Sequence, residues 1–556
     1  MLIARAFRRL RKSAPRFSVK SLRQEKRLSR RSMRVCLVGA ALVAGLAMPA
    51  AAQTPQRGGT LNYAVVSDPP NYDCHAHDTY VVTQSVGPFY STLLKFDLAR
   101  YPEVTGDVAR TWSVSPDGLT YAFELHPNVR FHDGTQLTSA DVRATYQRLR
   151  DPPQGVVSLR SATFADIAAI ETPSPTQIVF RLSAPNPAML QNFASPYNCI
   201  YSAPRLAQDP RFPVNNIMGS GAFRFVEHVR GSHLVGERFE GYFREGRPYL
   251  DGFRISFITQ ASAMLNALQG GQIHAEFRTV GPADRTRLEQ AMGNRIQFFE
   301  QTWSTGLIVA FNTERPPFND ARVRRALSLA IDRNAGSQGL RRTSILREVG
   351  GLIRPGAPFS ASPAELASLP GFGSDINAAR AEARRLLQEA GAANLRFALV
   401  NRSVPQPYTP AGVFLVDQWR RIGIEVEHRQ LETSPYVQAV RSSNFEVALD
   451  FQNQVLEDPT FTLLRYISSS RSPENPSKGS DPEADRLYDA ITRETNVEQR
   501  TQLIRQFERR VVTEAHQVPF LWWNRLVAMD ARVRGWRMSP SHVHGQDLTD
   551  VWLAAQ

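Results

Sequence analysis

The sequence predicts an α/β protein in which helices cover the faces of its sheets. Three times along the chain a helical apolar pattern ends at glycine and is followed by residues that alternate as in a strand. In the first case Gly270-Gly271 ends a helix over 261–269, before the alternating strand 273–277. The composition is that of an ordinary globular protein, with 42% hydrophobic and 21% charged residues. Helices placed between such strands favour α/β lobes with covered sheets.

Elements in the first third of the chain carry equally direct signals. Apolar and polar residues alternate after the Asp117-Gly118 turn and again over 178–182, and we predict a half-buried strand at each place. Thr138 and Asp141 resemble a capping box, which opens a helix. The apolar stripe of that helix consists of Val142, Tyr146 and Leu149.

Two asparagines stand where helix N-caps are expected in the second half of the chain. Asn319 precedes a helix with one apolar stripe that reaches Ile331. Asn377 precedes a helix over 378–390, which ends at Gly391 and leads into a strand over 395–399.

The remaining elements follow the same order. A helix over 414–421 ends at Gly423 and runs into a strand at 424–426. Towards the end of the chain, a helical face that continues to about Ala515 precedes the apolar run 518–523, which suits a short buried strand.

Charge is distributed very unevenly along the chain. The formal net charge of +14 would by itself suggest nucleic acid or an anionic membrane as partner. Residues 1–52, however, hold 13 Lys and Arg against one acid, Glu25, whereas the rest of the chain holds 53 basic and 51 acidic residues. The body of the protein is nearly neutral, and this excludes nucleic acid as the expected partner.

The basic N-terminus has the order of an export signal. Arg5 to Arg34 form a positive region, the 13 residues Val35 to Ala47 are uncharged, and Ala50-Ala51-Ala52 fits signal peptidase. We predict cleavage after Ala52 and a periplasmic location. A membrane anchor is the alternative, because residues 35–52 reach the lower limit of a spanning helix. The alanine and glycine content, Pro49 and the cleavage pattern favour the signal.

The export route stays open. Ser29 to Met33 resemble a twin-arginine export box, but Met33 and Arg34 stand where an aromatic residue or leucine is usual. Translation from Met33 instead of Met1 would remove the box. Cys36 precedes the apolar run, so no lipid-attachment context exists.

After cleavage two cysteines remain, Cys74 and Cys199. An oxidising compartment permits a disulfide between them. Two isolated thiols are the alternative, because nothing in the spacing requires the two residues to be close.

Four ordered motifs resemble a known family. The stretch VARTWSVSPDGLTYAFELHPNVRFHDGTQLTSADV, residues 108–142, is similar to the signature region of extracellular solute-binding proteins of family 5, the dipeptide, oligopeptide and nickel type. Residues 218–223, 267–271 and 311–327 resemble further segments of that family in the same order. The resemblance spans residues 57–536.

The resemblance implies a type II periplasmic binding protein with two lobes and an extra subdomain inserted in the first. By analogy, lobe one comprises residues 53–302 and 516–556, with the subdomain at about 98–214, and lobe two comprises 303–515. The chain would cross between lobes near 303–312 and 516–523. Hinge closure on a ligand would follow.

The resemblance also places candidate ligand contacts. In peptide-binding relatives an acidic side chain, three residues before the acid of a D-P dipeptide, pairs with the peptide's amino group. Here the dipeptide is Asp458-Pro459 and the matching residue is Val455, so that anchor is absent. Exposed turn residues are the alternative interpretation of the polar residues in this strand and loop. The candidates on this side are Asp450, Gln452, Asn453 and Gln454.

On lobe one, the segment 77–81 matches the part that lines the cleft in relatives, which gives Asp78, Tyr80 and Val81 as candidates. Trp303, at the first crossing, is a candidate for stacking on a ligand, with a buried core indole as the alternative. Trp522 and Trp523 alternate along a strand, so at most one of them should face the cleft.

Other polar motifs point to no further site. His75 and His77 would share one face of a strand, but no third ligand is identifiable, and we predict no metal and no cofactor. His132-Asp133-Gly134 is typical of a turn. Asp320 beside Arg322 suits charge placement at a helix end.

We therefore predict a non-catalytic, monomeric receptor that captures a peptide or peptide-like solute and delivers it to an inner-membrane ABC permease. A receptor of the same fold for an opine, a glycoside or a metal chelate is the alternative. A secreted hydrolase is a candidate of another class, but the chain holds no G-x-S-x-G, H-E-x-x-H or Gly-Lys phosphate loop. A signalling or chaperone-like binding role would share the fold without a transporter.

Overall fold

The computed structural model describes residues 54–404, 406–454 and 456–555. The predicted export signal and its cleavage site lie outside these residues, as does Val455. Among the described residues, no helix combines the length and the apolar character that crossing a membrane requires.

One large mixed sheet runs through the described chain. Two long antiparallel strands, β12 and β17, stand at its centre and pair over most of their length. In sheet order the strands are β15 (Glu425–Leu431), β14 (Arg396–Arg402), β16 (Val447–Asn453), β12 (Ile296–Phe311), β17 (Gln517–Asp530), β11 (Ala275–Glu276), β1 (Thr60–Val65), β10 (Gly252–Phe257), β9 (His233–Arg238) and β8 (Phe223–Val229), while β13 (Leu346–Glu348) pairs with β17.

Smaller sheets complete the β structure. A four-stranded antiparallel sheet has the order β4 (Ala109–Val114), β5 (Thr120–Leu125), β7 (Gln177–Leu182) and β6 (Ile167–Ser174). Two further pairs are β2 (Leu94–Phe96) with β3 (Val104–Gly106) and β18 (Val533–Arg534) with β19 (Trp552–Leu553).

Helices precede and follow the strands along the whole described chain. In the first half they are α2 (Tyr80–Val86), α3 (Ser139–Arg150), α4 (Met189–Phe193), α5 (Ala203–Gln208), α6 (Phe212–Asn215), α7 (Ala261–Gln269) and α8 (Pro282–Met292). In the second half they are α9 (Ala321–Leu329), α10 (Arg333–Leu340), α11 (Pro363–Ala367), α12 (Ile376–Glu389), α13 (Tyr408–Arg420), α14 (Thr433–Arg441), α15 (Thr460–Leu463), α16 (Pro482–Arg493) and α17 (Val497–Glu514).

Several elements agree with their sequence signals, and two caps do not. The helix 261–269 is α7, and Thr138 with Asp141 forms the predicted capping box of α3. The predicted N-caps Asn319 and Asn377 are wrong. The carboxylate of Asp320 accepts a hydrogen bond from the Arg322 amide at 2.8 Å, and that of Asp375 accepts one from the Ala378 amide at 2.9 Å. These two aspartates are therefore the N-caps of α9 and α12.

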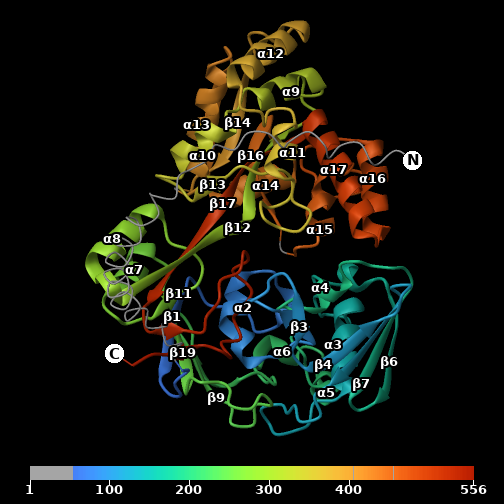
Figure 1. Cartoon of the computed structure of the whole chain (residues 1–556), viewed down its shortest axis with the longest axis vertical. Helices are drawn as coiled ribbons and strands as arrows, with labels where there is room; N and C mark the ends of the chain where they lie inside the picture. The colour runs from blue at the N-terminus through green and yellow to red at the C-terminus, as the bar shows by residue number, and fades with distance from the viewer. Residues whose placement is uncertain (1–53, 405, 455, 556) are drawn as a thin grey trace, which may run out of the picture. The chain divides into compact units, whose positions relative to one another are not determined.

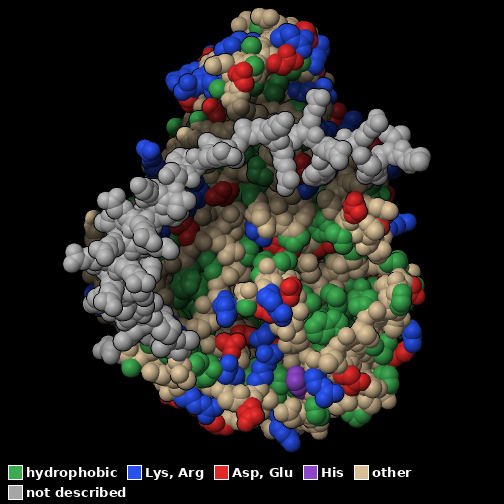
Figure 2. All heavy atoms as spheres, viewed as in Figure 1, with side chains coloured by type: hydrophobic (Ala, Val, Ile, Leu, Met, Phe, Trp, Pro, Cys, Tyr) green, Lys and Arg blue, Asp and Glu red, His purple; other side chains and the backbone are tan. Residues whose placement is uncertain are grey.

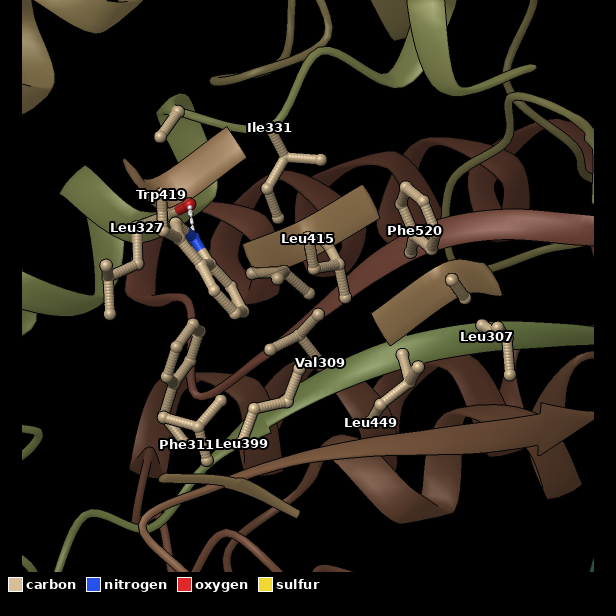
Figure 3. Close-up of a cluster of buried hydrophobic side chains, with 14 of the residues drawn as sticks. Leu307, Val309, Phe311, Leu327, Ile331, Leu399, Leu415, Trp419, Leu449 and Phe520 are labelled. Atoms are coloured by element: carbon tan, nitrogen blue, oxygen red, sulfur yellow. Dashed lines mark hydrogen bonds between the residues drawn. The ribbon is translucent and has the colours of Figure 1, made fainter. Parts of the chain in front are cut away.

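Three large hydrophobic cores hold the sheets to their helices. Core A lies around β12, β14 and β16 and is covered by α9, α12 and α13 (Figure 3). Within it Trp419 is fully buried, and its indole N–H donates to the Leu327 carbonyl at 2.9 Å. Core B lies around β1, β10 and α2, and core C lies around β5, β7 and α3. The four-stranded sheet thus has a core of its own.

The strand pair β12–β17 connects these regions. Figure 1 shows the two strands running together from the part of the sheet with β14 and β16 to the part with β1 and β11. The two segments in which we expect the chain to cross between lobes, 303–312 and 516–523, overlap β12 and β17 respectively. The predicted buried strand 518–523 is longer than expected, because β17 continues to Asp530 and pairs there with β11.

Charges of both signs are mixed on the surface. Figure 2 shows basic and acidic side chains interspersed over α12, where Arg385 pairs with Glu382 and Glu389. This mixing agrees with the nearly neutral charge of the chain after residue 52.

A disulfide closes a long loop within core B. Cys74 and Cys199 are bonded to each other, although 125 residues separate them in sequence. Cys74 lies in the short 3₁₀ helix Cys74–Ala76, and both cysteines are buried. A cross-link over so long a loop restricts the unfolded chain strongly.

Replacing both cysteines in Cys74→Ala/Cys199→Ala should lower the free energy of unfolding by about 2–5 kcal/mol, because the unfolded chain regains its freedom. Chemical denaturation of the wild type and the double variant, each with and without reductant, measures the effect. Reductant should destabilise the wild type and leave the variant unchanged. A wild type that is indifferent to reductant would contradict the bond.

Candidate functional site

Two arginines and four aromatic side chains from separate elements form an arginine–aromatic cluster at the strand pair β12–β17. Arg278 follows β11, and its guanidinium lies 5.3 Å from the ring centre of Tyr80 and 5.4 Å from that of Trp303. Trp303 meets Trp523 edge to face at 5.5 Å, and Trp523 meets Tyr408 at 6.1 Å. Arg402, at the end of β14, lies 5.5 Å over Tyr408. The cluster consists of Tyr80, Arg278, Trp303, Arg402, Tyr408 and Trp523.

The cluster reaches from one core to another. Tyr80 packs against core B, whereas Trp303, Tyr408 and Trp523 belong to core A. Its members therefore come from both sides of the strand pair, and the two tryptophans are part of the strands themselves.

An irregularity in the β12–β17 ladder explains the position of Trp303. Thr302 pairs with Asn524 and Gly306 with Trp522, so three residues of β12 lie opposite the single residue Trp523. Such a bulge re-aims side chains out of the regular alternation. Gly306 lets the two strands approach closely beside it, because a Cβ atom there would lie 3.0–3.3 Å from ring atoms of Trp522 and would require the ring to shift.

A neutral histidine, His542, accepts a hydrogen bond from Trp303. The indole N–H of Trp303 donates to Nδ1 of His542 at 3.0 Å, and the His542 ring also contacts Tyr80, with 4.8 Å between ring centres. Burial holds the pKa of His542 well below its usual value, and Arg525 and Arg278 lower it further. The imidazole is therefore an acceptor for Trp303.

Arg525 fixes the backbone that carries Arg278. Its buried guanidinium donates to the carbonyls of Arg278 at 3.0 Å and Ser539 at 2.7 Å, and also to that of Phe277. Burial lowers the pKa of Arg525 to about 9. The Arg525 guanidinium thus donates its hydrogen bonds to backbone carbonyls, whereas the side chain of Arg278 points into the cluster.

The carboxylate of Glu276 also holds the backbone at Arg278 in place. Its carboxylate accepts the backbone amides of Arg278 and Thr279, each at 2.8 Å. Burial raises the pKa of Glu276 to about 7, although these hydrogen bonds and the charge of Arg278 act in the opposite direction. The carboxyl is consequently only partly ionised near neutral pH.

Of the predicted candidates on the first side, Tyr80 and Trp303 lie in the cluster. Val81 is buried in core B, next to Tyr80 along α2. The side chain of Asp78 is exposed, and its backbone carbonyl accepts the Tyr197 hydroxyl at 2.7 Å.

The polar candidates at the end of β16 all bind other protein groups. Asp450 accepts from Arg465 at 2.8 Å and from the Tyr436 hydroxyl at 3.0 Å. The Gln452 side-chain oxygen accepts from Tyr466, while its amide nitrogen has no partner among the described residues. Asn453 accepts from Thr305 at 2.7 Å, and Gln454 accepts the Arg354 amide at 2.8 Å. A role of these residues in ligand binding stays a prediction.

Buried ion pairs and hydrogen bonds hold the loop after β16 in place. Glu457 is fully buried, with both oxygens 2.7 Å from Arg354 and one of them 2.8 Å from the Tyr101 hydroxyl. The Asp458 amide donates to the Gln191 side-chain oxygen at 2.8 Å, and its carboxylate is paired with buried Arg500. Tyr101 and Gln191 precede β12 in the chain, whereas Glu457 and Asp458 follow β16, so these bonds join segments that are far apart in sequence.

The histidine pair considered for a metal is arranged differently from the expectation. His75 lies in a 3₁₀ helix rather than on a strand, so His75 and His77 do not share a strand face. His75 contacts Arg148 at 2.8 Å, and His77 contacts Asn71 at 3.0 Å. Among the described residues there is no group of three or more side chains suited to a metal ion.

Sequence reasoning missed Arg278, Arg402, Tyr408 and His542. Arginine is frequent throughout this chain, and each of these residues stands in an unremarkable run of residues. Only the tertiary structure shows that they converge, so no signal in a single sequence identifies them.

Comparison with known proteins agrees with this architecture. The sequence model described as bacterial extracellular solute-binding proteins, family 5 (middle), matches residues 103–474. A protein of Brucella ovis, named among ABC transporter peptide-binding proteins, is 30% identical over 268 residues, which are 47% of this chain and 48% of the relative. This chain therefore matches about half the length of that relative.

Solved structures show the fold over a larger part of the chain. The periplasmic binding protein DppA of Helicobacter pylori, in complex with the peptide STSA, has a TM-score of 0.73 and 21% identity and covers 90% of this chain and 98% of its own. The binding protein AgaA of A. tumefaciens R10, in complex with agropinic acid, has a TM-score of 0.72 and 22% identity, with coverage of 90% and 99%. The fold is the two-lobed α/β fold of periplasmic binding proteins, as the sequence predicts.

Glu276 should give the protein a distinct pH dependence. In the unfolded chain its pKa is near 4.5, and burial raises it to about 7 in the folded state. The folded protein therefore keeps a proton that the unfolded chain releases, so this group should lower the free energy of unfolding as pH rises from 4.5 to 7, by about 3 kcal/mol in total, and have no further effect above.

The difference in unfolding free energy between wild type and Glu276→Gln, measured by denaturation at several pH values, isolates this contribution. The wild type should lose stability relative to the variant through that window. A difference that is independent of pH would show that Glu276 does not titrate there.

Proposed function

Because the chain belongs to the bacterial extracellular solute-binding proteins of family 5, we propose that it is the solute-binding component of an ABC importer. In this role it captures a peptide or a peptide-like small solute in the periplasm and delivers it to an inner-membrane permease. The arginine–aromatic cluster is the single observation that carries the proposal, because it connects side chains from both sides of β12–β17 through one series of contacts.

Closure about β12 and β17 would bring those groups onto the solute. The two lobes are proposed to comprise residues 53–302 with 516–556 and residues 303–515, with a subdomain at about 98–214 in the first. The bonds of Tyr101 with Glu457 and of Gln191 with Asp458 join segments of different lobes in this division. A solute that contacts both lobes stabilises the closed state by its differential affinity for that state.

The chemistry of the cluster suits a solute with an apolar part. Tyrosine and tryptophan offer large faces for apolar and planar groups, and their polar tips add direction. The relatives bind different solutes: STSA is a peptide and agropinic acid is not. Together with valine at position 455, this supports keeping an opine, a glycoside or a metal chelate as alternatives to a peptide.

The export signal at residues 1–52 completes the proposal. A cleaved signal delivers the nearly neutral chain to the periplasm, where the disulfide between Cys74 and Cys199 forms readily. We propose that the mature protein acts as a monomer, because one copy contributes all members of the cluster.

A cognate solute should raise the melting temperature of the ligand-free protein by mass action. The protein is unfolded, dialysed, refolded with its disulfide intact, and scanned with di- and oligopeptides, opines, glycosides and metal chelates. Saturable stabilisation by one class, without turnover of that compound, is expected. Turnover of a peptide or ester would contradict a receptor, as would the absence of any stabilisation by these compounds and by extracts of the host.

A further inference from the structure

Arg278 is a partly buried cation without a carboxylate partner among the described residues. Its Nε atom is buried and has no hydrogen-bond partner among the described residues, and its guanidinium is paired with no described carboxylate. Two aromatic faces partly replace water around it, at 5.3 and 5.4 Å. A buried donor without a partner is costly, and such an unsatisfied donor is accounted for where a further group binds to it.

Three other arginines of the described chain are each paired with a carboxylate, although Nε of Arg354 has no hydrogen-bond partner among the described residues. Arg354 is paired with Glu457, Arg500 with Asp458 and Arg465 with Asp450, in each case at 2.6–2.8 Å. Arg525 lies on β17, the strand that pairs with β11, and donates to three carbonyls. The contrast with Arg278 is therefore local to the cluster.

Glu276 does not neutralise Arg278. Its two oxygens are already occupied by the backbone amides of Arg278 and Thr279. Burial raises its pKa to about 7, so at neutral pH it carries only part of a negative charge. Glu276, two residues away in sequence, thus compensates the guanidinium charge only in part.

The remaining free groups of the cluster are donors as well. The indole N–H of Trp523 is buried and unpartnered among the described residues. Arg402 donates from Nε to the Thr433 hydroxyl at 3.0 Å and has no described carboxylate as partner. Cations and N–H donors thus accumulate at one place without a matching acceptor.

From this excess of donors we infer that the solute is a small organic anion, with an oxyanion group bound by Arg278 and an apolar part lying on the partly exposed ring of Tyr80. Arg402, across the cluster, adds a second positive charge. The inference rests on the proposed receptor function and narrows it. A peptide would bind in this way through its C-terminal carboxylate, because no member of the cluster is acidic and could pair with an amino group. A phosphorylated solute would use the same chemistry.

Chemical blocking of a natural mixture tests the class of solute without knowledge of its identity. The probe is the protein-free extract of the bacterium that carries the gene. One portion is left untreated, one is methyl-esterified to block carboxylates, one is treated with phosphatase, and one is acetylated to block amines. The thermal shift of the ligand-free protein is measured with each portion.

The untreated and acetylated portions should stabilise the protein, and the esterified portion should not if the anion is a carboxylate. Loss with phosphatase alone would identify a phosphate. If esterification and dephosphorylation, applied together, leave the shift intact, or if acetylation alone abolishes it, the inference is wrong while the receptor function stands. If no portion stabilises the protein, the receptor function fails, and the inference fails with it.

Variants assign the effect to the residue. Arg278→Gln should weaken binding of the active fraction by a factor of about ten or more, because a charge-assisted hydrogen bond is lost. Arg278→Lys, which keeps the charge, should retain part of the affinity. Arg287→Gln is the matched control, since Arg287 is exposed on α8 and binds only the side-chain oxygens of Asn266 and Gln269, and it should bind as the wild type does.

The stability of the solute-free variant separates binding from structure. Arg278→Gln removes no native ion pair, so its melting temperature without solute should equal or exceed that of the wild type. A strongly destabilised variant would show that Arg278 serves the fold. An Arg278→Gln protein that binds as tightly as Arg287→Gln would overturn the inference.

Discussion

The antiparallel pairing of β12 with β17 is the constraint on which the rest of the structure depends. These strands alone carry hydrogen bonds from β16, on one side of the sheet, to β11, on the other. Where the ladder is irregular, between Thr302 and Ile308, it brings Trp303 next to Trp523. The same feature thus joins two hydrophobic cores and positions the aromatic part of the candidate site.

Arginine serves two opposite purposes around this strand pair. Arg525, Arg354 and Arg500 are buried, and they hold turns and loops in place: Arg525 donates to backbone carbonyls, and the other two pair with carboxylates. Arg278 is held by a backbone that Arg525 and Glu276 fix, but its own guanidinium has no hydrogen-bond or carboxylate partner among the described residues. Pre-organised, unsatisfied donors of this kind favour a ligand because little reorganisation is needed on binding.

Local signals predicted the local structure well. Glycine stops and the Thr138 capping box located α7 and α3, because these features act within a few residues. The caps of α9 and α12 were misplaced by one and two residues, since a neighbouring aspartate competes with each asparagine. Tyr80 and Trp303, which the family resemblance predicted, lie in the cluster, and Trp303 is also buried in core A; their role in binding stays a prediction. Arg278 and Arg402 could not be found, because a missing partner is a property of the tertiary structure.

The central claim is that a solute closes the two lobes about β12 and β17. Since Cys74 and Cys199 are bonded, cysteines introduced at the exposed positions Ala168 in β6 and Ala378 in α12 can carry spin labels selectively. The distance between the labels is measured by pulsed electron resonance, with and without a stabilising extract. A shorter and narrower distance distribution with the extract is predicted. An unchanged distribution, under conditions where the extract raises the melting temperature, would contradict closure.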